Sequence, residues 1–193
     1  MAFIPVQPTG GVLYFANNHT FFKGDRFQVA ESVLSWLIHE EIIKPEKCVV
    51  RFQQNGHRFS EGIKRVVAEP FPDIDSDFNG LEYSTERQFL CWHQYFHYII
   101  CPNCKSDLEQ NSEHEDFFME AVWQWKDRDG ADFIHCPICC QKTFLCEFKI
   151  GHECMFSDLV FSFFGCRGVT ETFRTEFERR LGNPVRLFWW PTV

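Results

Sequence analysis

The sequence has 193 residues, of which 45% are hydrophobic and 24% charged, a globular composition that excludes a chain disordered throughout. Acidic residues outnumber basic residues by 27 to 19, which gives a formal net charge of −8. Because nucleic-acid binders gain affinity by neutralising phosphates with Lys and Arg, this balance argues against a general nucleic-acid binder and favours a basic partner.

The first residues, Met1–Pro8, lack the basic region and the long apolar stretch of a secretory signal peptide. The most apolar later stretch, residues 155–166, is interrupted by Asp158 and is shorter than the roughly 20 residues that a membrane span needs. We therefore predict a cytoplasmic protein that does not engage a membrane. In a reducing compartment, its ten cysteines indicate metal or redox chemistry rather than disulfides.

Residues 1–88 predict an N-terminal α/β segment of strand, helix and strand. An apolar run at 11–16 ends at two asparagines, as a strand that enters a turn does. Asp25 can cap a following helix, whose apolar residues recur at helical spacing until a proline stops it. A second strand is expected at 48–52, and the Asn-Gly pair at 55–56 predicts a turn after it.

Residues 69–87 predict a long acidic loop, with six carboxylates and one arginine. Asp73, Asp75 and Asp77 alternate as in a calcium-binding loop, but Gly80 comes too late for that motif and no Glu closes it. We therefore favour a solvated acidic loop over a calcium site.

Cysteine and histidine residues just before mid-chain raise the question of a second metal site. Cys91, His93 and His97 are closely spaced, but no Glu follows His93, so the zinc-protease pattern is absent. Histidines with hydrogen-bond partners in a core or interface are the simpler interpretation. His152 and Cys154 offer further ligands without a partner pair. Three cysteines in apolar contexts are expected to act as small buried hydrophobes: Cys48, Cys146 and Cys166.

The strongest pattern is a pair of Cys-Pro-x-Cys elements, which we call knuckles, with 31 residues between them. Each pair of thiolates can turn around one cation, and two pairs complete a tetrahedral sulfur shell that suits zinc. The predicted ligands of one structural zinc ion per chain are Cys101, Cys104, Cys136 and Cys139. Reduced buried thiols are one alternative. A redox-active pair is another, disfavoured because such pairs normally begin a helix, whereas the flanks here have strand character.

Together with the strands expected at 98–100, 133–135 and 143–148, the knuckles resemble a zinc ribbon over about residues 98–148. That resemblance implies two hairpin turns that clamp one structural zinc ion. Ribbon knuckles usually have Gly directly after the second cysteine, where this chain has Lys105 and Cys140. Cys140 therefore stays open as a substitute for the preceding cysteine. The spacing also exceeds the usual range of about 15–20 residues and implies an insertion.

The insertion, residues 107–132, carries nine carboxylates and only two Lys or Arg residues. Acidic side chains around embedded tryptophans predict a docking surface for a basic protein, with aromatic anchors and charge steering. Its candidate residues are Glu113, Glu115, Asp116, Trp123 and Trp125. The alternative is a helix that covers a sheet with its tryptophan face and exposes its carboxylates to water.

Residues 151–193 predict a helix and a strand that pack with the N-terminal segment. Thr170 can cap a helix with phenylalanines at four-residue spacing, and Gly182 can supply its left-handed end. The expected fold class is α+β: a mixed domain from the two chain ends, with a central zinc-ribbon-like element at 89–150. The whole chain is also similar to a set of uncharacterised bacterial proteins that share mid-chain knuckles and a closing segment like residues 177–185.

That set offers no activity to carry over, and zinc ribbons host several functions. The sequence lacks a nucleophile elbow, a Walker loop, a dinucleotide fingerprint and a zinc set with an open position, so we expect no enzyme. The predicted function is a zinc-stabilised protein-binding protein, such as a bacterial immunity protein that neutralises a basic toxin. The alternative is a nucleic-acid-binding regulator with a stripe of Arg174, Arg179, Arg180 and Arg186. A hidden enzyme would have to rely on His93, His97 and His135.

Overall fold

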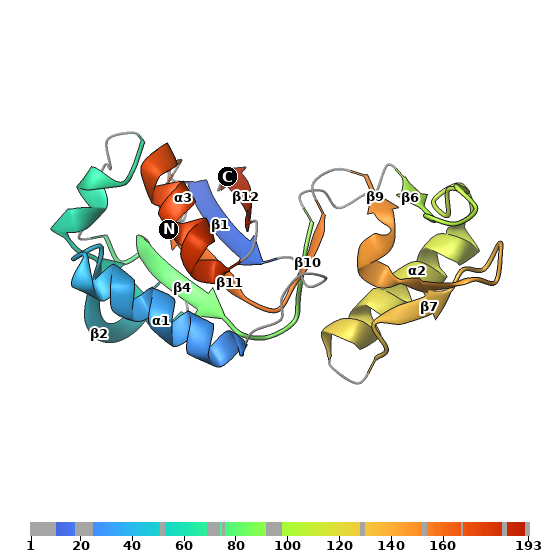
Figure 1. The fold of residues 1–193 in the computed structure, drawn as a ribbon, viewed down its shortest axis with the longest axis horizontal. Helices are drawn as coiled ribbons and strands as arrows, with labels where there is room; N and C mark the ends of the chain where they lie inside the picture. The colour runs from blue at the N-terminus through green and yellow to red at the C-terminus, as the bar shows by residue number, and fades with distance from the viewer. Residues whose placement is uncertain are drawn as a thin grey trace, which may run out of the picture. The chain divides into compact units, whose positions relative to one another are not determined.

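The computed structural model describes residues 11–17, 25–50, 53–68, 74, 76–91, 98–127, 130–151, 154–166, 168–182 and 185–191. The chain divides into two compact units (Figure 1). Unit 1 comprises the described residues of Met1–Thr85 and Leu159–Val193, and unit 2 those of Glu86–Asp158. The α+β class is confirmed, because helices and antiparallel ladders occur together. The sequence predicts a central element at 89–150, whereas unit 2 runs from Glu86 to Asp158.

Unit 1 is built on one six-stranded antiparallel sheet with the strand order β12-β1-β11-β4-β3-β2. Its strands are β1 (Gly11–Asn17), β2 (Ile43–Val50), β3 (Gln53–Phe59), β4 (Gly80–Ser84), β11 (Val160–Phe164) and β12 (Val185–Pro191). Strand β1 pairs with β11 on one side and with β12 on the other. The first described strand is thus held by two strands from the last part of the chain, so segments far apart in sequence share one sheet.

Two α-helices belong to unit 1, α1 (Arg26–His39) and α3 (Glu171–Leu181), and a short 3-10 helix, Glu61–Arg65, follows β3. The Asp25 carboxylate caps α1 by accepting hydrogen bonds from two first-turn backbone N–H groups, the nearer at 2.9 Å. Helix α3 is capped by Thr170 and ends at a glycine with φ of 70°, in the left-handed region. Both caps are those that the sequence predicts.

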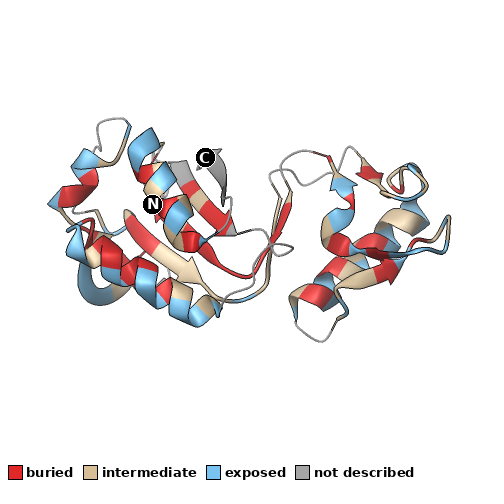
Figure 2. Ribbon diagram, in the orientation of Figure 1, coloured by how far each residue is buried: buried red, intermediate tan, exposed pale blue. Residues whose placement is uncertain are grey.

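The core of unit 1 is an aromatic cluster contributed by the sheet and both helices. Phe177 of α3 is fully buried, and its ring centroid lies 4.2 Å from that of Phe15 on β1 and 5.4 Å from that of Phe161 on β11. Trp36 of α1 stacks on Phe173 of α3 at 5.4 Å. Tightly packed rings combine burial of apolar area with favourable ring geometry. Figure 2 shows the buried positions of α1 and α3 alternating with exposed ones, as expected for helices that cover a core with one face.

The turn predicted at 55–56 is wrong. Gly56 lies inside β3, opposite Cys48 of β2, and the ladder continues to the pair of Val50 and Gln53. A Cβ atom added to Gly56 would lie 2.5 Å from the Val50 side chain. Glycine is therefore needed for the close approach of two neighbouring strands, and the chain reverses elsewhere.

The long acidic loop predicted at 69–87 is interrupted by regular structure. Strand β4 pairs with β11 and β3, and β5 (Gln88–Leu90) begins directly after the loop's expected end. Asp77 forms an ion pair with Arg58 of β3, so this carboxylate already has a cationic partner. Asp73 and Asp75 lie outside the described residues.

Within residues 86–91, 98–127, 130–151 and 154–158, unit 2 contains one α-helix and three short ladders. The ladders pair β5 with β10 (Met155–Ser157), β6 (Ile99–Ile100) with β9 (Lys149–Ile150), and β7 (Phe133–His135) with β8 (Lys142–Phe144). Helix α2 (Ser112–Lys126) lies in the predicted insertion, and a 3-10 turn, Leu145–Glu147, replaces the end of the strand expected at 143–148. The side chains of Phe118, Val122 and Trp125 on α2 are buried in a second hydrophobic core.

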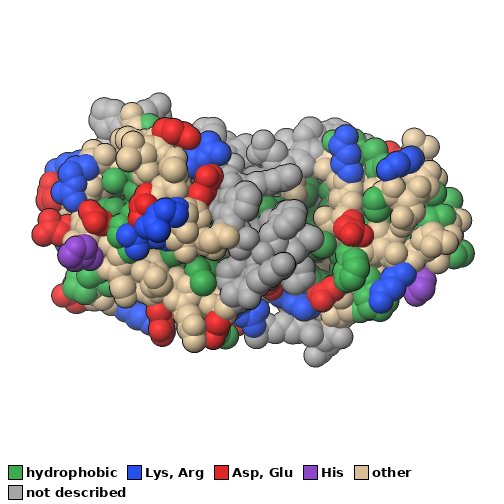
Figure 3. All heavy atoms as spheres, in the orientation of Figure 1, with side chains coloured by type: hydrophobic (Ala, Val, Ile, Leu, Met, Phe, Trp, Pro, Cys, Tyr) green, Lys and Arg blue, Asp and Glu red, His purple; other side chains and the backbone are tan. Residues whose placement is uncertain are grey.

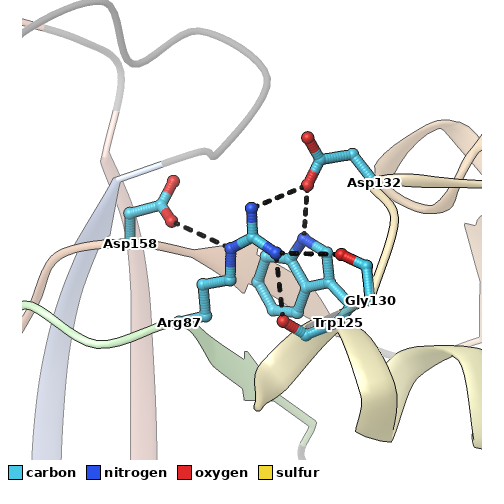
Figure 4. Close-up of polar contacts among 5 residues, drawn as sticks. All are labelled: Arg87, Trp125, Gly130, Asp132 and Asp158. Carbon is cyan, nitrogen blue, oxygen red and sulfur yellow. Dashed lines mark hydrogen bonds and ion pairs between the residues drawn. The ribbon is translucent and has the colours of Figure 1, made fainter. Parts of the chain in front are cut away.

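Arg87, one residue before β5, contacts the end of α2, the loop that follows it and the residue after β10 (Figure 4). One guanidinium nitrogen, Nη1, donates to the carbonyl oxygens of Trp125 at 3.1 Å and Gly130 at 3.4 Å. Nη2 lies 3.0 Å from an oxygen of Asp132, and Nε lies 4.0 Å from one of Asp158. The guanidinium carbon is 5.1 Å from the centre of the Trp125 ring. Arg87 therefore places a positive charge at the C-terminal end of α2, where the helix dipole favours it.

Candidate metal centre

Each knuckle is a tight turn at the end of a short strand. In the first, Cys101 follows β6, and its carbonyl oxygen accepts a hydrogen bond from the N–H of Lys105 at 3.0 Å. In the second, Cys136 follows β7, and its carbonyl oxygen accepts from the N–H of Cys140 at 2.8 Å. The two turns thus share one backbone hydrogen-bond pattern, which directs both cysteines of each knuckle to the inside of the turn.

The residue after each knuckle departs from the zinc-ribbon pattern in its type but not in its backbone conformation. Lys105 has φ of 62° and Cys140 has φ of 58°, both in the left-handed region that glycine adopts most easily. The backbone therefore keeps the conformation expected at these positions, although neither residue is glycine. Lys105 gains a local compensation, because its Nζ donates to the carbonyl oxygen of Pro102 at 2.6 Å.

The two turns bring four sulfur atoms together. The Sγ atoms of Cys101, Cys104, Cys136 and Cys139 all lie within 4.8 Å of one another, with 4.0 Å between those of Cys104 and Cys136. Sulfurs about 2.3 Å from one zinc ion in a tetrahedral shell would lie about 3.8 Å apart, so this spacing suits four thiolates around one metal ion. The cluster, which we call the cysteine cluster, can therefore hold a metal ion. Cys140 is exposed and lies outside it.

The protein environment favours the thiolate form of Cys104 and opposes that of Cys136. Hydrogen bonds from the Ser106 hydroxyl and backbone N–H lower the pKa of Cys104 to about 6. Burial raises the pKa of Cys136 to about 12. A bound divalent cation would compensate the burial of charge at Cys136, and its binding would displace the proton of that thiol.

Two polar residues next to the cluster were missed by the sequence analysis. The Asn103 side-chain amide, inside the first knuckle, donates to the hydroxyl of Thr143 at 2.8 Å, and Thr143 in turn donates to the carbonyl oxygen of Gln141 at 3.2 Å. Thr143 is fully buried. This chain of hydrogen bonds joins one knuckle to the strand that follows the other. The only signal in the sequence was a polar residue at one of the two variable knuckle positions.

The expectation that disulfides are disfavoured is wrong at one pair. Cys91 and Cys154 form a disulfide that spans 63 residues of sequence. His93, His97 and His152 lie outside the described residues, so the possible second metal site built on them is not described.

The remaining cysteines and one further histidine are dispersed. Cys166 is buried, and burial raises the pKa of its thiol, as suits a small apolar side chain. Cys48 and Cys146 are only half-buried. His135, the third histidine of the enzyme hypothesis, is exposed, and its Nδ1 lies 3.3 Å from the carbonyl oxygen of Cys140.

Helix α2 presents carboxylates and aromatic rings on one exposed face, which we call the acidic–aromatic surface. Trp123 is 53% exposed and Phe117 is 45% exposed. The carboxylates of Glu113, Asp116 and Glu120 are exposed at helical spacing along the same side. Figure 3 shows hydrophobic side chains among charged ones at the surface of unit 2.

Two of the residues predicted to bind a partner do not belong to this surface. Trp125 is fully buried, and its indole Nε1 donates to Asp132 at 3.0 Å. Its position two residues after Trp123 places it on the opposite side of the helix, against the core. Glu115 is half-buried and lies on the side of α2 nearer to the core, so it does not belong to this surface either.

The arginines proposed for nucleic-acid binding are engaged with carboxylates of their own helix. Arg179 and Arg180 each donate to Glu176 at 2.7 Å, and Arg174 donates to Glu178 at 3.1 Å. The bonds from Arg179 and Arg180, that of Arg179 foremost, lower the pKa of Glu176 to about 2. The described part of the stripe is therefore charge-balanced, and the side chain of Arg186 lies outside the described residues.

Comparison with known proteins does not assign this chain to a family. No protein-family model, curated protein or solved structure matches the chain. Among the described residues, no helix is long and apolar enough to span a membrane.

Proposed function

We propose that the cysteine cluster binds one structural zinc ion. Support comes from the chemistry of the ligands: four sulfurs at tetrahedral spacing match the preference of zinc for thiolates in structural sites. With all four positions taken by protein, no coordination site remains for water or substrate, so the metal would act on folding and not on catalysis.

Metal analysis of the purified protein tests this proposal, with about one zinc ion per chain as the expected result. Cys101→Ser should lose the metal and lower the melting temperature. Cys140→Ser is the matched control, because Cys140 is adjacent to a cluster cysteine but exposed and outside the cluster. A wild-type protein without zinc, or equal zinc content in the two variants, would contradict the proposal.

We further propose that the protein is a non-enzymatic binding protein that docks a basic protein on the acidic–aromatic surface. An immunity protein that neutralises a basic toxin would use such a surface. The observation that carries this proposal is the exposure of Trp123 and Phe117 on a helix face lined with carboxylates. Exposed aromatic anchors give affinity, and a mainly negative surrounding charge steers a basic partner, although Lys126 places one positive charge 5.3 Å from the centre of the Trp123 ring.

The rigidity of α2 supports the same function. Its inner face is fixed by the buried side chains of Phe118 and Trp125, while Arg87 holds its C-terminal end. A helix backbone that is already fixed does not have to be ordered when a partner binds, so more of the contact energy appears as affinity. The backbone positions that carry the outer rings are therefore set before binding.

Affinity capture from lysate of the source cells, with and without nuclease, tests the docking proposal when it is run on matched variants. A basic protein should be retained at near-equal amount after nuclease, and Trp123→Ala should lower its affinity about 30-fold. Phe144→Ala is the control, because Phe144 is also an exposed ring of unit 2 but lies on β8. Equal capture by both variants would refute this surface, and nuclease-sensitive recovery would favour nucleic-acid binding.

Charge is tested separately with the triple variant Glu113→Gln, Asp116→Asn and Glu120→Gln. It should slow association with the captured basic protein and weaken the salt dependence of that rate, because steering by charge acts mainly on association. The rate of dissociation should change less than in Trp123→Ala. An association rate that is unchanged at low salt would contradict charge steering.

A further inference from the structure

We propose that Cys91 and Cys154 form a reversible, redox-sensitive disulfide that ties together the strands by which the chain enters and leaves unit 2. Cys91 directly follows β5, and Cys154 directly precedes β10. The ladder pairs Leu90 with Met155, so the next pair in the same register is Cys91 with Cys154. The Cα atoms of the two cysteines are 4.1 Å apart. Directly opposite residues of an antiparallel ladder approach to about 4.5 Å in its narrow pairs.

The pairing of the two cysteines does not depend on the bond between them. The β5/β10 ladder holds three residue pairs next to it, and Arg87, one residue before β5, lies 4.0 Å from Asp158, one residue after β10. The reduced thiols are therefore kept opposite each other, and one thiol is held at high effective concentration near the other. That arrangement favours rapid closure of the bond once either thiol is activated.

Both redox forms fit the same site. In the bonded structure, the Sγ of Cys154 lies 3.5 Å from the carbonyl oxygen of Gly151, so a thiol at the same position would have an acceptor for its proton. Both cysteines are half-buried, so small thiols and disulfides can reach them. Cys166, by contrast, is buried. Exposed or partly exposed disulfides are the ones that exchange with a thiol pool, whereas buried structural ones resist reduction.

The bond would form by exchange with a low-molecular-weight disulfide such as oxidised glutathione. One cysteine thiolate attacks that disulfide, which gives a mixed disulfide and releases one small thiolate. The second cysteine thiolate then attacks the protein sulfur of the mixed disulfide, which closes the Cys91–Cys154 bond and releases the second small thiolate. Two protein thiols are oxidised by two electrons, the small disulfide is reduced to two thiols, and reversal of both steps reopens the bond.

Closure of the bond would restrict the whole segment between the two cysteines, which contains both knuckles and α2. Because a cross-link across a long loop disfavours open states, oxidation should suppress local opening of unit 2. The redox state of the pair would thus set how often the segment that carries the cysteine cluster and the acidic–aromatic surface opens. Formation of the bond itself rests on neither the proposed zinc ion nor the proposed partner.

The test equilibrates the full-length protein in glutathione buffers of stepped ratio, traps free thiols by alkylation and identifies the bonded peptides by mass spectrometry. The Cys91–Cys154 peptide should rise with oxidation and disappear on return to reducing buffer, with a midpoint inside the range of ratios. Cys48→Ser should keep this behaviour, because Cys48 is a free half-buried cysteine of unit 1. Hydrogen exchange at β5, β10 and α2 should be on the order of tenfold faster in the reduced protein. Cys91→Ser should exchange at the reduced rate in every buffer.

Several outcomes would overturn the proposal. Alkylation of both cysteines at every ratio would exclude the bond, and persistence of the bond at the most reducing ratio would make it a permanent structural link. Exchange rates that do not change with oxidation would remove the switch. Two metal ions per chain that fall to one in Cys91→Ser would assign the pair to a second metal site. A zinc-free protein that still shows the reversible peptide would contradict the zinc proposal alone.

Discussion

The two units of this protein reach stability by different means. In unit 1, β1 alone pairs with β12 over seven residue positions and with β11 over five, and an aromatic core lies against the sheet. In the described part of unit 2, the three ladders contain only two or three residue pairs each, and α2 contributes Phe118, Val122 and Trp125 to the core. Isolated two-stranded ladders are marginal in water. Unit 2 therefore relies on side-chain links at a few points, namely the cysteine cluster, Arg87 and the Cys91–Cys154 bond.

Of all changes, removal of the metal should separate the stabilities of the two units most. A strong zinc chelator at neutral pH is expected to abolish the cooperative unfolding of unit 2 and to leave that of unit 1, because the free energy of structural zinc binding is part of the folding free energy. Calorimetry would follow the two units as separate unfolding transitions. Two undiminished transitions after removal of all metal would show that unit 2 is held without the cluster.

Loss of one aromatic ring from the core of unit 1 should destabilise unit 1 and leave the metal content of unit 2 unchanged. Phe177→Ala should lower the free energy of unfolding by about 3–5 kcal/mol, because it leaves a cavity where several rings meet. Urea denaturation gives the cost, and metal content should stay at the wild-type level. Phe118→Ala is the matched variant, since that ring is equally buried in the core of unit 2 and its loss should weaken metal retention. Equal metal loss in the two variants would show that the units are coupled.

Replacing Arg87 should weaken unit 2 by a smaller amount. Arg87→Met removes the donor to two carbonyl oxygens and the cation between Asp132 and Asp158, at a cost of about 2–3 kcal/mol. Arg87→Lys should restore only part of this, because an ammonium cannot reproduce the planar fork. Denaturant unfolding monitored at unit 2 measures the effect. Full rescue by Lys would mean that charge alone matters at this position.

Relief of backbone strain in one knuckle should have the smallest effect, and in the opposite direction. Lys105→Gly should stabilise unit 2 by about 0.5–1 kcal/mol, because glycine adopts the left-handed conformation of Lys105 without a Cβ clash. Lys142→Gly, in strand β8, is the control and should destabilise the unit. Thermal melts of the metal-loaded proteins would compare the two. A destabilised Lys105→Gly would show that the bond from Lys105 to Pro102 outweighs the strain.

The sequence revealed those features that depend on residues close together in the chain. The knuckles could be predicted because ligand type and spacing are local, and the caps at Asp25 and Thr170 because a cap bonds to its own first turn. Trp125 could also have been placed correctly. Two residues along a helix correspond to about 200° of rotation, so Trp123 and Trp125 cannot both face a partner.

The features that were missed depend on pairings between distant segments. The Asn-Gly signal at 55–56 was outweighed by a ladder that needs Gly56 for close strand approach. The contacts of Arg87 reach residues 38 and 43 positions away, so no local pattern could mark it. The Cys91–Cys154 pair joins residues 63 positions apart, and cysteine spacing alone does not define connectivity.

The pairing of β4 with β11 has a consequence for how this chain can be divided. The two strands are antiparallel neighbours, with Ser84 opposite Val160, although all of unit 2 lies between them in sequence. Unit 2 thus occupies the place of the turn in a β-hairpin. Exchange of that segment for a two-residue Asn-Gly loop would preserve the register of the sheet. In sequence, unit 1 is therefore a domain with one insertion point between β4 and β11, and unit 2 is the inserted segment.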